Sequence, residues 1–313
     1  MSMHDVIFTG GKLMRKKELK GTAMLLLTAF IWGIAFVAQS DGMNYVGPFT
    51  FNCVRMVIGG LVLIPCIFIL ERMKGSRTEK KVERTNKKYM FIGGILCGIA
   101  LGAAAALQQI GIQYTTVGKA GFITAMYIII VPVLGIFFRR KAGVRVWISV
   151  IIAVAGLYLL CMSGSLKLGR GDLLVLLCAL VFSVHILLID YFSPKTDGVK
   201  MSCIQFLTAG LISAVPMLLF EKPAVSDITA AWLPILYAGV LSCGVAYTLQ
   251  VIAQKDADPT VASLVLSLES VFSVLAGWVI LGQVLSGREI LGCVLMFAAI
   301  ILAQLPSVSK RGA

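Results

Sequence analysis

The ionisable residues best suited to chemistry in this chain lie within long apolar runs. Glu269 falls near the centre of "SLVLSLESVFSVLAG", and His185 falls within "CALVFSVHILLID". An ionised carboxylate is costly in such surroundings, so Glu269 is a candidate proton carrier or a partner for a cationic substrate group. A histidine titrates close to neutral pH and could serve in the same pathway. For both residues a structural alternative stays open, in which the side chain only bonds to a neighbouring helix.

Arg55 lies about two turns into another apolar run. Its long side chain could reach an interface and anchor the helix, or it could contact an anionic substrate or Glu269. Gln108 and Gln250 recur at equivalent places in two distant runs. Paired amides of this kind suit a polar cavity, and they equally suit hydrogen bonds between helices.

Three aromatic residues complete the candidate set. Trp32, Tyr127 and Tyr247 lie within apolar runs and could line a cavity for an apolar or aromatic substrate group. The sequence has no Walker motif and no cysteine or histidine spacing typical of a zinc site. We therefore expect no cofactor, no metal and no direct use of ATP.

Composition indicates where these residues reside. Of the 313 residues, 58% are hydrophobic and 14% are charged, whereas soluble domains average about 45–50% and about 25%. The excess forms runs of roughly 20 residues, the length that crosses a hydrocarbon layer about 30 Å thick as a helix. Backbone groups in lipid must be satisfied within each segment, so we predict an all-α membrane protein embedded in lipid.

Most of the charged residues lie between these runs. The predicted spans are 21–40, 48–70, 89–113, 118–138, 144–162, 172–192, 201–220, 229–253, 260–282 and 288–305. This division leaves a basic arm at 1–20 and a tail at 306–313. Alternate loops carry most of the 28 lysines and arginines, which mark the cytoplasmic side, so both termini are predicted to be cytoplasmic. The net charge is +13, but the basic residues form no stripe with interleaved aromatics, which argues against nucleic-acid binding.

The ten spans fall into two similar series of five. Residues 21–39 align with 171–189 at an offset of 150, and "LQQI" from Leu107 aligns with "LQVI" from Leu249 at an offset of 142. The longer basic loop of the first series accounts for the difference between the two offsets. The constant order and spacing of the helices supports a repeat more strongly than the few identities do.

An odd number of spans in each repeat requires the second repeat to enter the membrane from the opposite side. We therefore predict two inverted five-helix repeats, at 21–162 and 172–305, with a binding site at their interface. In this alignment Glu269 stands where the first repeat has Tyr127. Any chemistry of charge is then carried unequally by the two repeats.

Several segments also resemble a known family. They are "WGIAFVAQ", "RMVIGGLVLIP", "GKAGFITAMYIIIVPVLG" and "ASLVLSLESVFSVLAGWVILGQ", which together are similar to the EamA type of the drug/metabolite transporter superfamily. The resemblance covers essentially the whole chain. It implies a ten-helix carrier of the inner membrane, commonly an exporter of amino acids or other metabolites. Ser270 and Gln283 depart from the family pattern, which often has proline and glutamate at these places.

Two backbone features carry further expectations. Gly94, Gly98 and Gly102 form a GxxxGxxxG face that predicts close packing against another helix. Pro132 removes a hydrogen-bond donor within the span at 118–138 and predicts a kink there.

The function predicted from the sequence is secondary active transport of small organic metabolites by alternating access. The expected partners are a small-molecule substrate, a coupled proton and membrane lipid. The alternatives are a channel, a membrane protein that does not transport, and, with less support, a membrane enzyme. An enzyme would need a cluster of nucleophile or metal ligands, and the chain has only two histidines.

Overall fold

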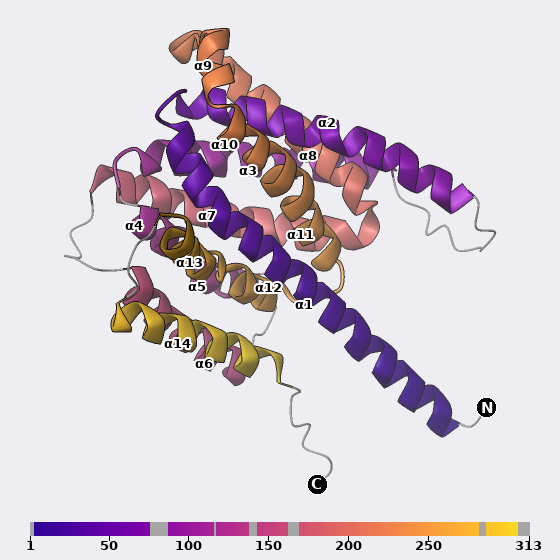
Figure 1. The fold of residues 1–313 in the computed structure, drawn as a ribbon. Coiled ribbons are helices and arrows are strands. Elements are labelled where there is room, and N and C mark those ends of the chain that lie inside the picture. The colour runs from indigo at the N-terminus through magenta and orange to yellow at the C-terminus, as the bar shows by residue number, and fades with distance from the viewer. Residues whose placement is uncertain are drawn as a thin grey trace.

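The computed structural model of the chain describes residues 3–75, 87–115, 117–137, 143–161, 169–281 and 286–305. Within these ranges the chain is a bundle of helices, without a strand (Figure 1). The central part of the basic loop after the second span, residue Gln283 and the tail at 306–313 lie outside the described residues.

Eight helical stretches of the described chain are long and apolar enough to cross a membrane. They are Leu19–Gly42, Pro48–Arg72, Lys87–Ile112, Ala120–Phe137, Arg170–Lys195, Gly198–Glu221, Trp232–Ala253 and Pro259–Ala276. A shorter apolar helix covers Val144–Leu160. The predicted tenth span corresponds to α14 (Gly287–Gln304), which is not among the eight, so the count of ten stays a prediction.

The first three helices are continuous. They are α1 (Met3–Gly42), α2 (Pro48–Gly75) and α3 (Lys87–Ile112). The α1 helix begins well before the predicted span at 21, because the preceding lysines, leucine and glutamate favour helical backbone. Further along the chain, α6 (Val144–Cys161) is the last helix of the first repeat. The second repeat begins with α7 (Arg170–Phe192), which is followed by α8 (Gly198–Pro216) and its π-helical extension η2 (Met217–Glu221).

Two predicted spans are broken in the middle. The span at 118–138 divides into α4 (Val117–Thr124) and α5 (Tyr127–Phe137), and the span at 260–282 divides into α12 (Pro259–Leu266) and α13 (Glu269–Leu281). The first break lies at Ala125 and Met126, ahead of the kink predicted at Pro132. The sequence had predicted one helix for each span, with a kink at Pro132 in the first, and it gave no sign of these breaks.

The two breaks have the same hydrogen-bond pattern. Backbone bonds to the third preceding residue join Met126 to Ile123 in the first repeat and Leu268 to Val265 in the second, at distances of 3.1 and 3.2 Å. Both pairs are related by the offset of 142 that the sequence repeat gives. The interruption is therefore a repeated feature of the fold.

The predicted span at 229–253 is also irregular. It consists of α10 (Trp232–Leu236), the π-helix η3 (Tyr237–Tyr247) and α11 (Thr248–Ala253). The remaining short elements are the 3₁₀ turn η1 (Ser193–Lys195) and the helix α9 (Val225–Ala230). Wider helical turns of the π type often occur at functional sites.

Helix packing follows the repeat. The α6 and α14 helices lie side by side, and so do α2 and α8, so each pair joins equivalent helices of the two repeats (Figure 1). The close contact of α3 with α7, where Gly111 meets Gly171, has its equivalent in the contact of α1 with α11, where Gly21 meets Ala253. These reciprocal contacts are what two repeats related by a two-fold axis produce.

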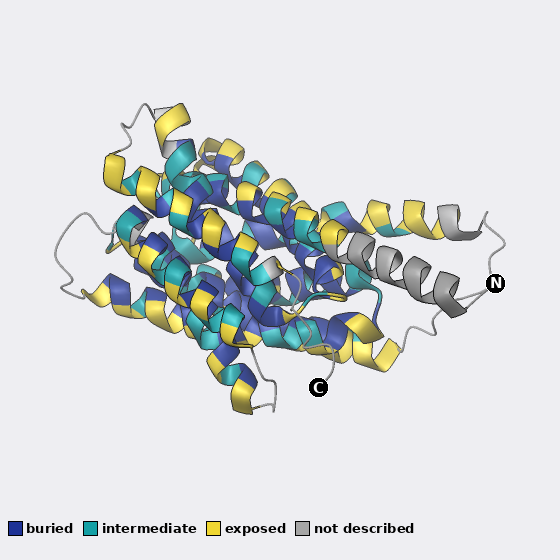
Figure 2. Ribbon diagram, turned by 90° about the horizontal axis from the view of Figure 1, so that it is seen from below, coloured by how far each residue is buried: buried dark blue, intermediate teal, exposed yellow. Residues whose placement is uncertain are grey.

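The outer surface of the bundle is apolar. Large hydrophobic side chains such as Phe137 and Phe220 are 79% and 78% exposed, and exposed residues lie along the outward faces of the helices (Figure 2). Buried residues occupy the interior. An outer apolar surface of this extent suits lipid, in agreement with the predicted membrane protein.

The glycine face of α3 packs closely against α8, as predicted. A methyl group on Gly94 would lie 2.6 Å from Ile204, and one on Gly98 would lie 2.6 Å from both the Gln205 carbonyl oxygen and Thr208. Glycine lets the two backbones approach at these points.

Two carboxylates join the ends of the α2–α8 pair. Glu221 accepts hydrogen bonds from the backbone amides of Phe49 and Thr50, at 2.9 and 2.6 Å, and from the Thr50 hydroxyl at 2.6 Å. It thereby caps the first turn of α2 from the other repeat. At the opposite end, Lys200 pairs with Glu71. Thr50 and Lys200, like Glu71 and Glu221, are related by an offset of 150, so these are equivalent contacts with different chemistry.

We expect Gly98→Ala to destabilise the protein by about 1–3 kcal/mol, because the added methyl group would overpack the α3–α8 contact. The melting temperature of the purified protein in detergent measures this effect. Gly287→Ala is the control, since no atom lies within 4 Å of the methyl position there. Equal stability of the two variants would contradict the packing described.

We expect Glu221→Gln to destabilise the protein by about 1–2 kcal/mol, because the substitution removes a charged cap from α2. The matched control is Glu71→Gln. Its ion pair is solvent-exposed and contributes about 0–1 kcal/mol. Thermal unfolding in detergent compares the two variants, and a larger loss for Glu71→Gln would show that the cap is not the stronger contact.

Candidate substrate cavity

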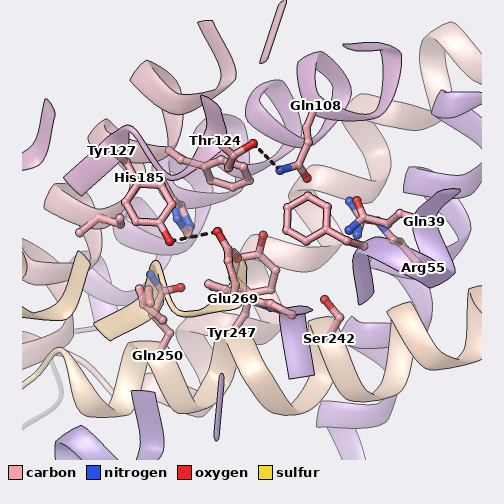
Figure 3. A pocket seen from close by; sticks show the side chains of 15 residues that line it. Gln39, Arg55, Gln108, Thr124, Tyr127, His185, Ser242, Tyr247, Gln250 and Glu269 are labelled. Atoms are coloured by element: carbon pink, nitrogen blue, oxygen red, sulfur yellow. Dashed lines mark hydrogen bonds between the residues drawn. The ribbon is translucent and has the colours of Figure 1, made fainter. Parts of the chain in front are cut away.

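A cavity lies between the two repeats (Figure 3), and about 490 Å³ of space not filled by atoms lies within it, part of which is open to solvent. All eight residues that the sequence singled out line it: Trp32, Arg55, Gln108, Tyr127, His185, Tyr247, Gln250 and Glu269. Seven further residues complete the wall: Phe36, Gln39, Thr124, Phe182, Ile186, Ser242 and Leu266. The structure thus brings together residues from helices of both repeats.

Ten of these fifteen residues form pairs that the repeat relates. The offset of 150 relates Trp32 to Phe182 and Phe36 to Ile186, and the offset of 142 relates Gln108 to Gln250, Thr124 to Leu266 and Tyr127 to Glu269. Equivalent residues of two repeats can surround one cavity only if the axis relating the repeats passes through it. The cavity therefore lies at the centre of the repeat symmetry.

Tyr127 and Glu269 locate the axis most closely. Each is the first residue of the helix that follows a break, α5 or α13. The Tyr127 hydroxyl donates a hydrogen bond of 3.0 Å to Glu269 Oε1, as the dashed line in Figure 3 shows. A residue can touch its own repeat equivalent only close to the axis, so this bond lies at the axis that relates the repeats.

The position of Glu269 reduces the cost of burying its carboxyl group. The residue is 5% exposed and lies in the first turn of α13, where the helix dipole favours a negative charge. Tyr127 is its hydrogen-bond partner, and neither Lys nor Arg forms an ion pair with it in the described ranges. A proton or a cationic ligand could therefore supply the compensating charge.

His185 bonds across helices. Its Nε2 lies 3.2 Å from Gln205 Oε1 of α8, and its ring packs edge-on to Phe182 and Tyr247, with centroids 6.4 and 6.0 Å apart. The structural alternative for His185 predicted such a hydrogen bond to a neighbouring helix. The residue nevertheless lines the cavity, so a role in the pathway stays a prediction.

Arg55 points into the protein. Its side chain is 3% exposed and lines the cavity, so it does not reach an outer interface as the anchoring alternative required. Its Nε donates to Asn52 Oδ1 at 2.9 Å, and its guanidinium carbon lies 5.5 Å from the centre of the Phe51 ring. The buried cation is therefore held in place by an amide and an aromatic ring.

Several polar atoms of the wall have no protein partner. Gln108 Nε2 donates to Thr124 Oγ1 at 3.2 Å, but Trp32 Nε1, Gln39 Oε1 and Gln250 Oε1 are buried without a hydrogen bond. Buried polar groups are normally satisfied. A hydrated or polar ligand in the cavity would satisfy these three.

Aromatic rings form another part of the wall. The rings of Trp32 and Tyr247 have centroids 4.5 Å apart, and Tyr247 also packs against Phe206 at 5.8 Å. This surface suits an apolar or aromatic group. In the described part of the chain no cluster of three or more His, Cys, Asp or Glu residues could hold a metal ion.

The sequence pointed to eight residues of the wall, but it missed the polar Gln39, Thr124 and Ser242 as well as the apolar residues. Phe36, Ile186 and Leu266 look like ordinary packing residues in an apolar run. The repeat offset applied to Trp32 would have given Phe182, and an amide within the first span would have given Gln39.

Comparison with known proteins identifies the family. The model of the EamA-like transporter family matches residues 19–162 and again residues 169–305. The chain belongs to the EamA-like transporter family. Membership makes it a membrane transporter rather than an enzyme, and it agrees with the resemblance found in the sequence.

Curated relatives share nearly the whole length. An uncharacterised transporter of Archaeoglobus fulgidus is 29% identical over 290 residues, covering 92% of this chain and 87% of the relative. The uncharacterised transporter YoaV of Bacillus subtilis is 24% identical over 285 residues, covering 89% and 94%. A crystal structure with 19% identity covers 91% of this chain and 96% of its own, with a TM-score of 0.73, and shows the same fold.

Proposed function

We propose that this transporter is a secondary active carrier that exports small organic metabolites, amino acids or related compounds, by alternating access. The observation that carries the proposal is the contact of Tyr127 with its repeat equivalent Glu269 inside a cavity that both repeats line. Inverted repeats can exchange conformations, so that a site on their axis faces each side in turn.

The broken helices support this mechanism. Discontinuous helices at the centre of a membrane are a recurrent way of building substrate and ion sites in carriers. Here both breaks come directly before the residues on the axis, Tyr127 and Glu269. The ends of four short helices thus meet at the cavity, where small movements of either repeat would change the shape of the site.

The cavity wall supports the substrate class. Arg55 and Glu269 contribute opposite charges without forming an ion pair with each other, and Trp32 and Tyr247 contribute an aromatic surface. A small molecule with both polar and apolar parts would fit such a wall. The free amide oxygens of Gln39 and Gln250 add acceptors for a protonated amine.

The setting that we propose is the cytoplasmic membrane with both termini on the cytoplasmic side. Its support is the distribution of Lys and Arg among the loops of the sequence. We further propose that a proton is the coupling ion and that Glu269 carries it.

Transport in proteoliposomes tests the carrier against a channel. We expect saturable uptake that is accelerated by unlabelled substrate on the opposite side, because a carrier returns faster when it is loaded. A mixture of labelled amino acids serves as the first probe. Flux that increases linearly with concentration, without counterflow, would indicate a channel and contradict the proposal.

Substitution of Glu269 tests the proton pathway. We expect Glu269→Gln to abolish uptake driven by a pH gradient, since an amide cannot carry the proton, while exchange of substrate at equal pH persists. Glu71→Gln, the same substitution outside the cavity, should behave as the wild type. If Glu269→Gln kept the substrate affinity and the pH dependence of the wild type, Glu269 would have no part in coupling.

A further inference from the structure

One buried charge has no counter-charge in the described structure. Arg55 is 3% exposed, and a guanidinium group stays protonated in proteins. No Asp or Glu of the described ranges forms an ion pair with it. Figure 3 shows Arg55 beside Gln39 at one side of the cavity, with Glu269 and Tyr127 further along the wall.

The surroundings of Arg55 hold its guanidinium group but do not neutralise it. Asn52 Oδ1 accepts from Nε, and the Phe51 ring lies against the cation. The terminal nitrogens have no hydrogen-bond partner in the described chain, although their residue lines the cavity. The edge that carries the two terminal nitrogens remains open, and it can bind a carboxylate through two parallel hydrogen bonds.

The adjacent amide is also incomplete. Gln39 is 5% exposed and lines the same end of the cavity, and its Oε1 has no partner. Its backbone carbonyl accepts from Gln109 Nε2 at 3.1 Å, which fixes this part of α1. A buried arginine and a buried amide with unused bonding capacity, both facing one cavity, form a site prepared for a polar ligand.

The second repeat lacks this feature. The positions equivalent to Arg55 in α8 are Gln205 and Phe206, which carry no charge and pack against His185 and Tyr247. The cation is therefore not required by the repeat fold itself. Its presence in one repeat alone gives the cavity a single positive end.

We propose that the Arg55 end of the cavity is a subsite for the carboxylate group of the transported molecule. The carboxylate accepts hydrogen bonds from the terminal guanidinium nitrogens, and the Gln39 oxygen accepts from a neighbouring donor of the same molecule. The rest of the substrate then extends along the wall towards Tyr127 and Glu269. This inference rests on the proposed transport function and assigns an orientation to the substrate within it.

The first test needs no ligand. Arg55→Gln removes a buried charge that has no acidic partner in the described chain. Without substrate, the melting temperature of this variant in detergent should therefore equal or exceed that of the wild type. Arg55→Lys, which retains the charge, should show no such gain. A melting temperature of Arg55→Gln clearly below that of the wild type would show that Arg55 serves structure, and would overturn the proposal.

The second test compares acids with their amides in counterflow. Phenylalanine, leucine and glutamine are each paired with the corresponding carboxamide, with chloride and phosphate at matched ionic strength as control anions. We expect the wild type to prefer the acid about tenfold or more, as loss of a charged hydrogen bond predicts. Arg55→Gln should lose this preference and retain the affinity for the amide.

The outcomes separate the two proposals. An unchanged preference for the acid in Arg55→Gln, or equal competition by phosphate, overturns the carboxylate subsite while transport itself stands. Absence of counterflow with every compound counts against the proposed substrate class. The melting temperatures then decide whether Arg55 serves structure, which would overturn the subsite.

Discussion

A polypeptide in lipid can leave the helical hydrogen-bond pattern only where protein or a cavity covers the exposed backbone groups. The two breaks in this chain obey that constraint, since Ala125 and Leu268 are fully buried. The breaks therefore have to lie inside the bundle, at the interface of the repeats. Their position brings the first residues of α5 and α13 to the repeat axis, and the Tyr127–Glu269 bond follows from it. The other cavity residues are arranged around this point.

The two repeats share their broken helices and their close helix contacts, whereas their chemistry differs. The first repeat supplies a cation at Arg55, and the second supplies the carboxyl group of Glu269 and the imidazole of His185. In the alternating access that we propose, a repeated backbone would supply the two conformations of similar packing that the mechanism requires. A symmetric set of side chains would bind a substrate equally well in two opposite orientations. The unequal set gives the cavity distinct ends, as the proposed orientation of the substrate requires.

The sequence predicted the spans, the repeat and most polar residues of the cavity because polar residues are conspicuous within apolar runs. It could not reveal the breaks, since Ala125, Met126, Ser267 and Leu268 include neither glycine nor proline. The expected kink at Pro132 followed local backbone chemistry, but tertiary contacts across the axis determine where the chain departs from the helix. For the same reason the apolar part of the wall, such as Leu266, could not be told from the core.

The two ends of the α2–α8 pair differ in strength, and this difference bears on how the repeats can move. Glu221 binds two backbone amides and a hydroxyl and is partly buried, while the Glu71 and Lys200 side chains are 51% and 34% exposed. An exposed ion pair contributes little because water competes for both charges. The Glu221 carboxylate, which accepts three hydrogen bonds, loses more when the helices separate. In the alternating access that we propose, rocking of the repeats would therefore meet unequal resistance at the two ends, and the two conformations would differ in energy.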